Sequence, residues 1–219
     1  MEEKITKTYF RSPDAKVLVI GHDPRLQTSN TQAEYAFFAD YFFKPKSSDR
    51  REHAKYELAE ALYTYINWLT DNKYNIDDFI ITNLCNHHLP KAPTGKTVFI
   101  PEDKAKEGLE NIKQILKEFK IKFILATSQQ VNYWLQKLGF YNSENDFLIK
   151  SEPKENGVRD NYYEAVQSRA FLDICGREYL ADGIPLFPVL HIKQYPLRSR
   201  IKANYEKLLL NCINEIKKL

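Results

Sequence analysis

The sequence predicts a three-layer α/β/α protein with a central four-stranded parallel sheet, formed by one domain that spans residues 1–219. Short apolar runs alternate with amphipathic helical patterns, and the runs are apolar throughout rather than at every second residue. Strands that helices cover on both faces have this continuous apolar character. No linker, repeat or low-complexity segment interrupts the order, which implies right-handed crossovers within one domain.

Four apolar, β-branched runs are the predicted strands. The first, KVLVIG, stops at a glycine, and the others are FIITN, IKFILA and LFPVLH. Each has a length usual for a buried strand. They cover residues 16–21, 79–83, 121–126 and 186–191. We expect them to lie parallel, with the first two among the central strands.

The segments between these runs carry helical patterns. Apolar residues recur at three- and four-residue spacing over 52–71, and the segment 101–119 begins with a proline and two acidic residues, a typical helix start. Residues 129–138 and 199–218 are also predicted to be helical. The polar stretch 141–160 is expected to form a long surface loop.

Composition limits the classes to which the protein can belong. The chain has 219 residues, 43% of them hydrophobic, which is enough for a full core. It has no apolar stretch of the roughly 18–20 residues that a membrane span requires, and its first residues lack a signal-peptide core. The 3 cysteines are scattered, which fits a reducing compartment. An all-cysteine iron–sulfur cluster takes four of them. We therefore expect a cytoplasmic protein with no membrane partner.

Polar residues with catalytic potential follow three of the predicted strands. His22 and Asp23 come directly after the first strand, Asn83 ends the second, and His191 ends the last. The carboxyl ends of parallel strands meet at one edge of the sheet, where ligands bind in open α/β folds. The simplest alternative is that Asp23 and its neighbours form only a turn.

Four motifs, in order, resemble the uracil-DNA glycosylase superfamily. The sequence GHDPR at 21–25 is similar to the family's Gly-Gln-Asp-Pro-Tyr, Ala36-Phe37 to its Ala-Phe pair, and Asn83 to its strand-end asparagine. His191, followed by Pro196-Leu197, resembles the closing His-Pro-Ser-Pro-Leu. The resemblance runs from about residue 16 to 205, and it implies a DNA glycosylase that acts in base excision repair on uracil or another damaged or deaminated base.

The resemblance also implies a role for each matching residue. Asp23 and His191 would be catalytic: Asp23 would orient water and stabilise the cationic sugar, and His191 would stabilise charge on the leaving base. His22, Phe37 and Asn83 would bind the base. Phe37 would stack on it, and the Asn83 amide would match its edge with a donor and an acceptor. Arg25 replaces the family's tyrosine and would set the base specificity.

The C-terminal part of the chain is basic, as DNA binding requires. From His191 onward, Lys and Arg outnumber Asp and Glu, although a solvated helix face has the same composition. The family's leucine loop would correspond to the residues predicted to bind DNA, which are Lys193, Tyr195, Pro196, Leu197, Arg198 and Arg200.

We expect a monofunctional, metal-free and cofactor-free monomer whose partner is DNA. The sequence TGKT at 94–97 lacks the leading glycine and the preceding strand of a phosphate-binding loop. The sequence CNHH at 85–88 lacks the paired cysteines of a zinc site. Two alternatives remain open: a catalytically silent DNA- or RNA-binding member of the same fold, and an unrelated small-molecule hydrolase, which a missing Gly-x-Ser-x-Gly motif disfavours.

Overall fold

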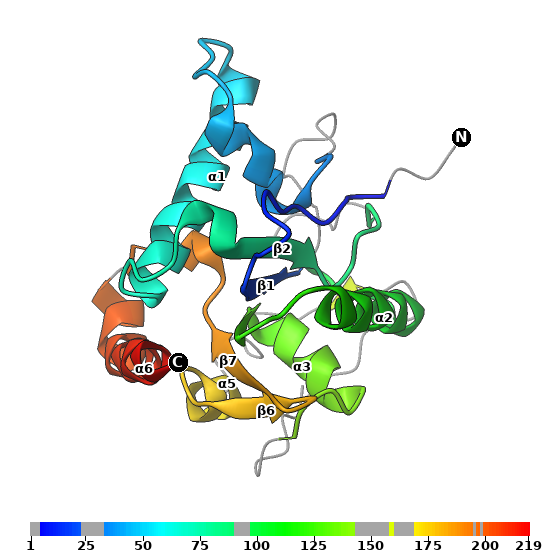
Figure 1. The fold of residues 1–219 in the computed structure, drawn as a ribbon, viewed down its shortest axis with the longest axis vertical. Helices are drawn as coiled ribbons and strands as arrows, with labels where there is room; N and C mark the ends of the chain where they lie inside the picture. The colour runs from blue at the N-terminus through cyan, green and yellow to red at the C-terminus, as the bar shows by residue number, and fades with distance from the viewer. Residues whose placement is uncertain are drawn as a thin grey trace.

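The centre of the fold is a five-stranded sheet in the order β2-β1-β4-β7-β6 (Figure 1). The computed structural model describes residues 5–22, 33–89, 97–142, 158–159, 169–194, 196–197 and 199–219. The strands are β1 (Val17–Gly21), β2 (Phe79–Asn83), β4 (Phe123–Thr127), β6 (Tyr179–Ala181) and β7 (Ile184–Val189).

The four predicted strands are present and parallel. β1 lies between β2 and β4, and β7 lies on the far side of β4. Every residue of β1, β2 and β4 is buried, as expected for strands covered on both faces. The register pairs Gly21 with Asn83, so the last residues of β1 and β2 are neighbours.

Two expectations about the sheet were wrong. A fifth strand, β6, pairs antiparallel with β7, so the sheet is mixed rather than a four-stranded parallel one. Asp182 and Gly183 join the two strands with φ of 49° and 80°, as a two-residue hairpin turn requires. In addition, β2 ends the strand order instead of lying centrally. Tyr9 bridges Ile81 there, which partly covers that edge.

The long helices agree with the predicted segments, whereas several short elements were not predicted. The long helices are α1 (Arg50–Leu69), α2 (Glu102–Glu118), α3 (Gln129–Lys137) and α6 (Ser199–Lys218). The short elements are η1 (Ala36–Phe43), η2 (Ile76–Asp78), η3 (Ile192–Gln194), α5 (Arg169–Ile174), β3 (Thr97–Val98) and β5 (Val158–Arg159). β5 pairs antiparallel with β3, so the expected loop 141–160 contains a short strand; residues 143–157 and 160 lie outside the described part.

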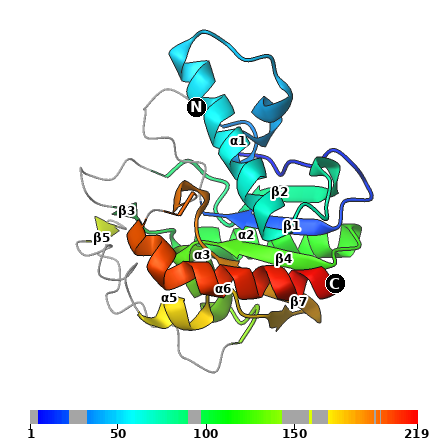
Figure 2. The same cartoon turned by 90° about the vertical axis from the view of Figure 1, so that its left-hand side faces the viewer.

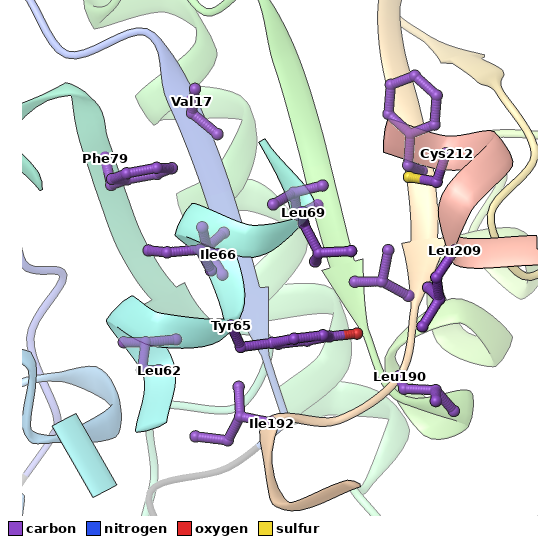
Figure 3. Packing of buried hydrophobic residues seen from close by; sticks show 14 of the residues in the cluster. Val17, Leu62, Tyr65, Ile66, Leu69, Phe79, Leu190, Ile192, Leu209 and Cys212 are labelled. Atoms are coloured by element: carbon purple, nitrogen blue, oxygen red, sulfur yellow. The ribbon is translucent and has the colours of Figure 1, made fainter. Parts of the chain in front are cut away.

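Helices cover both faces of the sheet and create two buried clusters (Figure 2). Val17 and Val19 of β1 face α1 and α6, whereas Leu18 and Ile20 face α2 and α3. Figure 3 shows Ile66 of α1 close to the sheet face that carries Val17. The arrangement is the three-layer α/β/α architecture that the sequence predicts. Among the described residues, no helix has the length and apolar character needed to cross a membrane.

Candidate functional site

The carboxyl edge of the sheet brings together residues from four separate parts of the chain. Gly21 and Asn83 are register partners. A Cβ built on Gly21 would overlap the Cε2 and Cζ atoms of Phe37 and would lie 2.5 Å from Asn83 Oδ1. The ring of His191 lies 6.0 Å from that of Phe37, at an interplanar angle of 45°. Gly21 therefore lies between the Phe37 ring and the Asn83 amide, and only a glycine leaves room for both at this position.

Phe37 has an unusual backbone conformation. Its φ is 56°, and that of Phe38 is 55°, both in the left-handed region that bulky residues avoid. Each such residue costs about 1–3 kcal/mol and persists only when its surroundings fix it. The two residues turn the chain inside η1, and Phe37 is 8% exposed. Strained residues of this kind concentrate at functional sites, so the conformation supports a role for this ring.

An N-terminal strap, residues 5–9, fixes the segment that carries Phe37. The Lys7 N–H donates to Glu34 O at 2.8 Å, and the Ala36 N–H donates to Lys7 O at 3.1 Å. On its other side the strap bonds to the β2 region: the Thr6 N–H donates to Asn86 O at 2.9 Å, and Tyr9 exchanges two bonds with Ile81. The strap thereby links the approach to Phe37 with the strand that ends in Asn83.

Asn83 is fully buried, yet its side-chain amide has no hydrogen-bond partner in the part of the chain that the structure describes. Its exposed fraction is 0%, and neither its Oδ1 nor its Nδ2 has a hydrogen-bond partner among the residues that the structure describes. Most buried polar groups have a partner, and leaving one unpaired costs about 1–3 kcal/mol. A ligand edge that offers one acceptor and one donor would satisfy this amide.

The remaining predicted residues are described to different extents. His22 and His191 are both partly buried, and His22 directly follows β1. Pro196 is exposed, and Leu197 is partly buried against the cluster under α1 and α6. Asp23, Arg25, Tyr195 and Arg198 lie outside the described residues. Lys193 lies in η3 and Arg200 in α6, but their side chains are not described.

One residue at the same edge was not predicted. Ser128 follows β4 with φ 77° and ψ 157°, a region occupied almost only by glycine. Its N–H donates to Val189 O at 2.9 Å, and its Oγ accepts from the Val131 N–H at 3.4 Å as the N-cap of α3. A serine directly before a predicted helix is a capping signal. The strained backbone, however, has no signature in the sequence.

A histidine after β2 contacts a carboxylate of α2. His87, after β2, contacts Glu107 of α2 with 2.7 Å between Nε2 and Oε1, and this hydrogen bond lowers the pKa of Glu107.

Among the described residues, no group of three or more His, Cys, Asp or Glu side chains is arranged to hold a metal ion. The three cysteines are buried and free, and burial raises the pKa of Cys175 and of Cys212.

Comparisons with known proteins add no relative from which a function could be transferred. No protein-family model matches the chain, and no curated protein matches it. The fold and the site therefore define an α/β protein with a strained aromatic residue at the carboxyl edge of its sheet, beside an amide that has no partner among the described residues. The functional interpretation depends on that geometry and on the sequence motifs.

Proposed function

We propose that this protein is a DNA glycosylase that hydrolyses the bond between deoxyribose and a damaged or deaminated base. The observation that carries the proposal is the unsatisfied Asn83 amide beside Gly21 and the ring of Phe37. A flipped base such as uracil presents a carbonyl acceptor and an N–H donor along one edge, and a flat face above it. Those are the contacts that this amide and this ring can make.

The energy of base flipping sets what the site must supply. Removing a base from the stack costs a few kcal/mol, which pocket contacts offset. Stacking on an aromatic ring contributes about 1–3 kcal/mol per base. The fixed position of Phe37 helps, because a ring already held in place loses little freedom when a ligand binds.

The chemistry assigns the polar residues separate roles. In this proposal the Asp23 carboxylate orients the water whose oxygen bonds to C1′ and takes its proton. The electrons of the breaking C1′–N bond leave on the base, where an N–H of His191 donates to the carbonyl oxygen that gains charge. Arg25 contacts the base or a neighbouring phosphate, and Lys193, Arg198 and Arg200 contact the DNA backbone.

Single-turnover excision from oligonucleotides tests the proposal. The panel contains uracil, hypoxanthine, xanthine and hydroxymethyluracil, each in single- and double-stranded DNA. Asp23→Asn should lower the excision rate about 10²–10⁴-fold and leave DNA affinity nearly unchanged, because the amide keeps the shape but not the charge. Asp14→Asn, at an exposed position, is the matched control. Equal excision rates for the parent and Asp23→Asn would mean that the segment GHDPR forms only a turn.

Two further variants test the specificity and the binding surface. Arg25→Tyr should shift the base preference toward uracil without abolishing binding. Replacing Lys193, Arg198 and Arg200 together with alanine should weaken DNA binding for all sequences and flatten its salt dependence by about one unit of slope per lost phosphate contact. Unchanged binding at every salt concentration would remove this loop from the DNA interface.

The silent-binder alternative predicts a different pattern. If the parent binds DNA with the dependence on Lys193, Arg198 and Arg200 described above but excises no base from the panel, the fold serves binding without chemistry. If it neither binds nor excises, the proposal fails and the small-molecule hydrolase becomes the better interpretation.

A further inference from the structure

A cavity lies between the N-terminal strap, the segment after β2 and helix α2. Its volume is about 330 Å³, within the range of small-molecule sites. Residues 5–8 of the N-terminal strap form one wall, Asn86 and His87 a second, and helix α2 the third. None of Gly21, Phe37, Asn83 and His191 lines it, so it is separate from the candidate base site.

The charges that line the cavity favour an anion. Lys7 and Lys104 each contribute an ammonium group, whereas Glu107 contributes the one carboxylate of the described lining. Lys104 lies 3.3 Å from Glu107 Oε2, and Lys7 lies 3.4 Å from Glu34. Both distances exceed the 2.7–2.9 Å typical of a strong charge-assisted bond, so a better acceptor can compete for these ammonium groups.

The second wall contributes the imidazole of His87. The His87 side chain is 6% exposed and its Nε2 lies 2.7 Å from Glu107 Oε1. Its Nε2 also lies 3.4 Å from the Lys104 ammonium.

Asn86 favours a ligand that also carries a hydrogen-bond donor. Its Oδ1 is buried and has no hydrogen-bond partner within the described part of the chain. The Thr6 N–H holds the Asn86 backbone carbonyl at 2.9 Å, which fixes the residue in the wall. A ligand that carries a hydroxyl or an N–H beside its anionic group would supply a donor to this oxygen.

We infer that this cavity binds a sugar phosphate, with the phosphate between Lys7 and Lys104 and a sugar hydroxyl on Asn86 Oδ1. A phosphate monoester carries between −1.5 and −2 charges near pH 7 and three strong acceptor oxygens, which suits two ammonium groups better than a carboxylate does. The same chemistry is present in a free sugar phosphate and at the 5′-phosphate end of a nucleic acid strand. The inference does not depend on glycosylase activity.

Calorimetric titration with ribose 5-phosphate tests it, with ribose and inorganic phosphate as the partial probes. Ribose 5-phosphate should bind best, inorganic phosphate more weakly, and ribose should give no measurable heat. Lys104→Met should weaken ribose 5-phosphate binding roughly tenfold, the effect of one charge-assisted hydrogen bond. Lys113→Met, on the same helix but outside the cavity lining, should bind as the parent does.

Two variants predict effects that misfolding cannot imitate. Glu107→Gln removes the carboxylate and should tighten phosphate binding severalfold. Asn86→Ala should weaken ribose 5-phosphate without changing inorganic phosphate. Absence of binding by the parent at millimolar probe, or equal affinities for the parent and Lys104→Met, would overturn the inference.

Two short oligonucleotides that differ only in carrying a 5′-phosphate or a 5′-hydroxyl distinguish a free sugar phosphate from the end of a nucleic acid strand. A preference for the 5′-phosphate that Lys104→Met removes supports the site and assigns it to nucleic acid ends. Binding of ribose 5-phosphate without that preference supports a free metabolite. An Asn83→Leu variant should bind ribose 5-phosphate as the parent does, which separates this site from the proposed glycosylase site.

Discussion

Two buried asparagines near the carboxyl ends of β2 and β4 have opposite surroundings. Asn83 and Asn132 are both 0% exposed. The Asn132 Nδ2 donates to Ala126 O at 2.9 Å and to Ser128 O at 2.7 Å, and its Oδ1 accepts from the Tyr141 hydroxyl at 2.8 Å. The Asn83 amide has no such partner among the described residues. The difference separates a buried amide that bonds to three groups of the fold from one that has no partner among the described residues.

The largest expected effect concerns Asn83. Replacing it with leucine removes the amide that we propose to bind the base while keeping its approximate volume. Under the proposed function the excision rate should fall about 10²–10³-fold, the usual cost of losing one preorganised hydrogen-bonding group. The free energy of unfolding should stay equal or rise, because the amide that is removed has no hydrogen-bond partner among the described residues. A loss of stability above about 2 kcal/mol would show instead that Asn83 is structural.

Asn132→Leu should reverse that pattern. The substitution removes the bonds that the Asn132 side chain makes with the Tyr141 hydroxyl, Ala126 O and Ser128 O, which should cost about 2–4 kcal/mol of stability in urea unfolding. Excision measured on the folded fraction should match the parent. A large loss of activity in the folded protein would mean that the two asparagines do not have separate roles.

Gly21→Ala sharpens the comparison, since its Cβ would overlap Phe37 and approach the Asn83 amide. Overpacking of this kind typically costs about 1–3 kcal/mol and should also displace the ring, so excision should fall with stability. Gly183→Ala is the control: its φ is 80° with nothing within 4 Å of a built Cβ. It should cost about 1 kcal/mol of backbone strain and leave excision unchanged.

The smallest effect depends on pH and tests the Asn132 network. Burial raises the pKa of Tyr141 well above its ordinary value of 10.0, so the folded protein keeps this proton when the unfolded chain loses it. Stability should therefore fall as the pH rises above about 10, by roughly 1 kcal/mol at pH 11 for this one group. A Tyr141→Phe variant has no hydroxyl at this position, so it does not show this loss of stability at high pH. Its stability relative to the parent should improve by this amount between pH 9 and pH 11, measured by urea unfolding.

The sequence predicts the regular parts of this fold well, because burial on both faces imposes a local pattern. The run VLVIG is apolar at every residue since β1 is covered by helices on both sides. The proline and acids at the start of 101–119 give α2 its correct beginning. The sequence analysis did not predict the fifth strand, β6, although Asp182-Gly183 is a strong hairpin signal. The reason is that β6, Tyr179–Ala181, has only three residues.

The candidate site also has features that the sequence predicts and features that only the tertiary structure shows. The sequence by itself determined that Gly21, Asn83 and His191 end or follow strands, which brings them to one edge of a parallel sheet. Only the tertiary structure decided that Phe37 turns against Gly21 in a left-handed conformation, held by the N-terminal strap, and that Asn83 lacks a described partner while Asn132 has three. The reason is that chain order and periodicity are local properties. Backbone strain and hydrogen-bond satisfaction depend instead on contacts between residues far apart in the chain, such as those from Lys7 to Glu34 and from Asn132 to Tyr141.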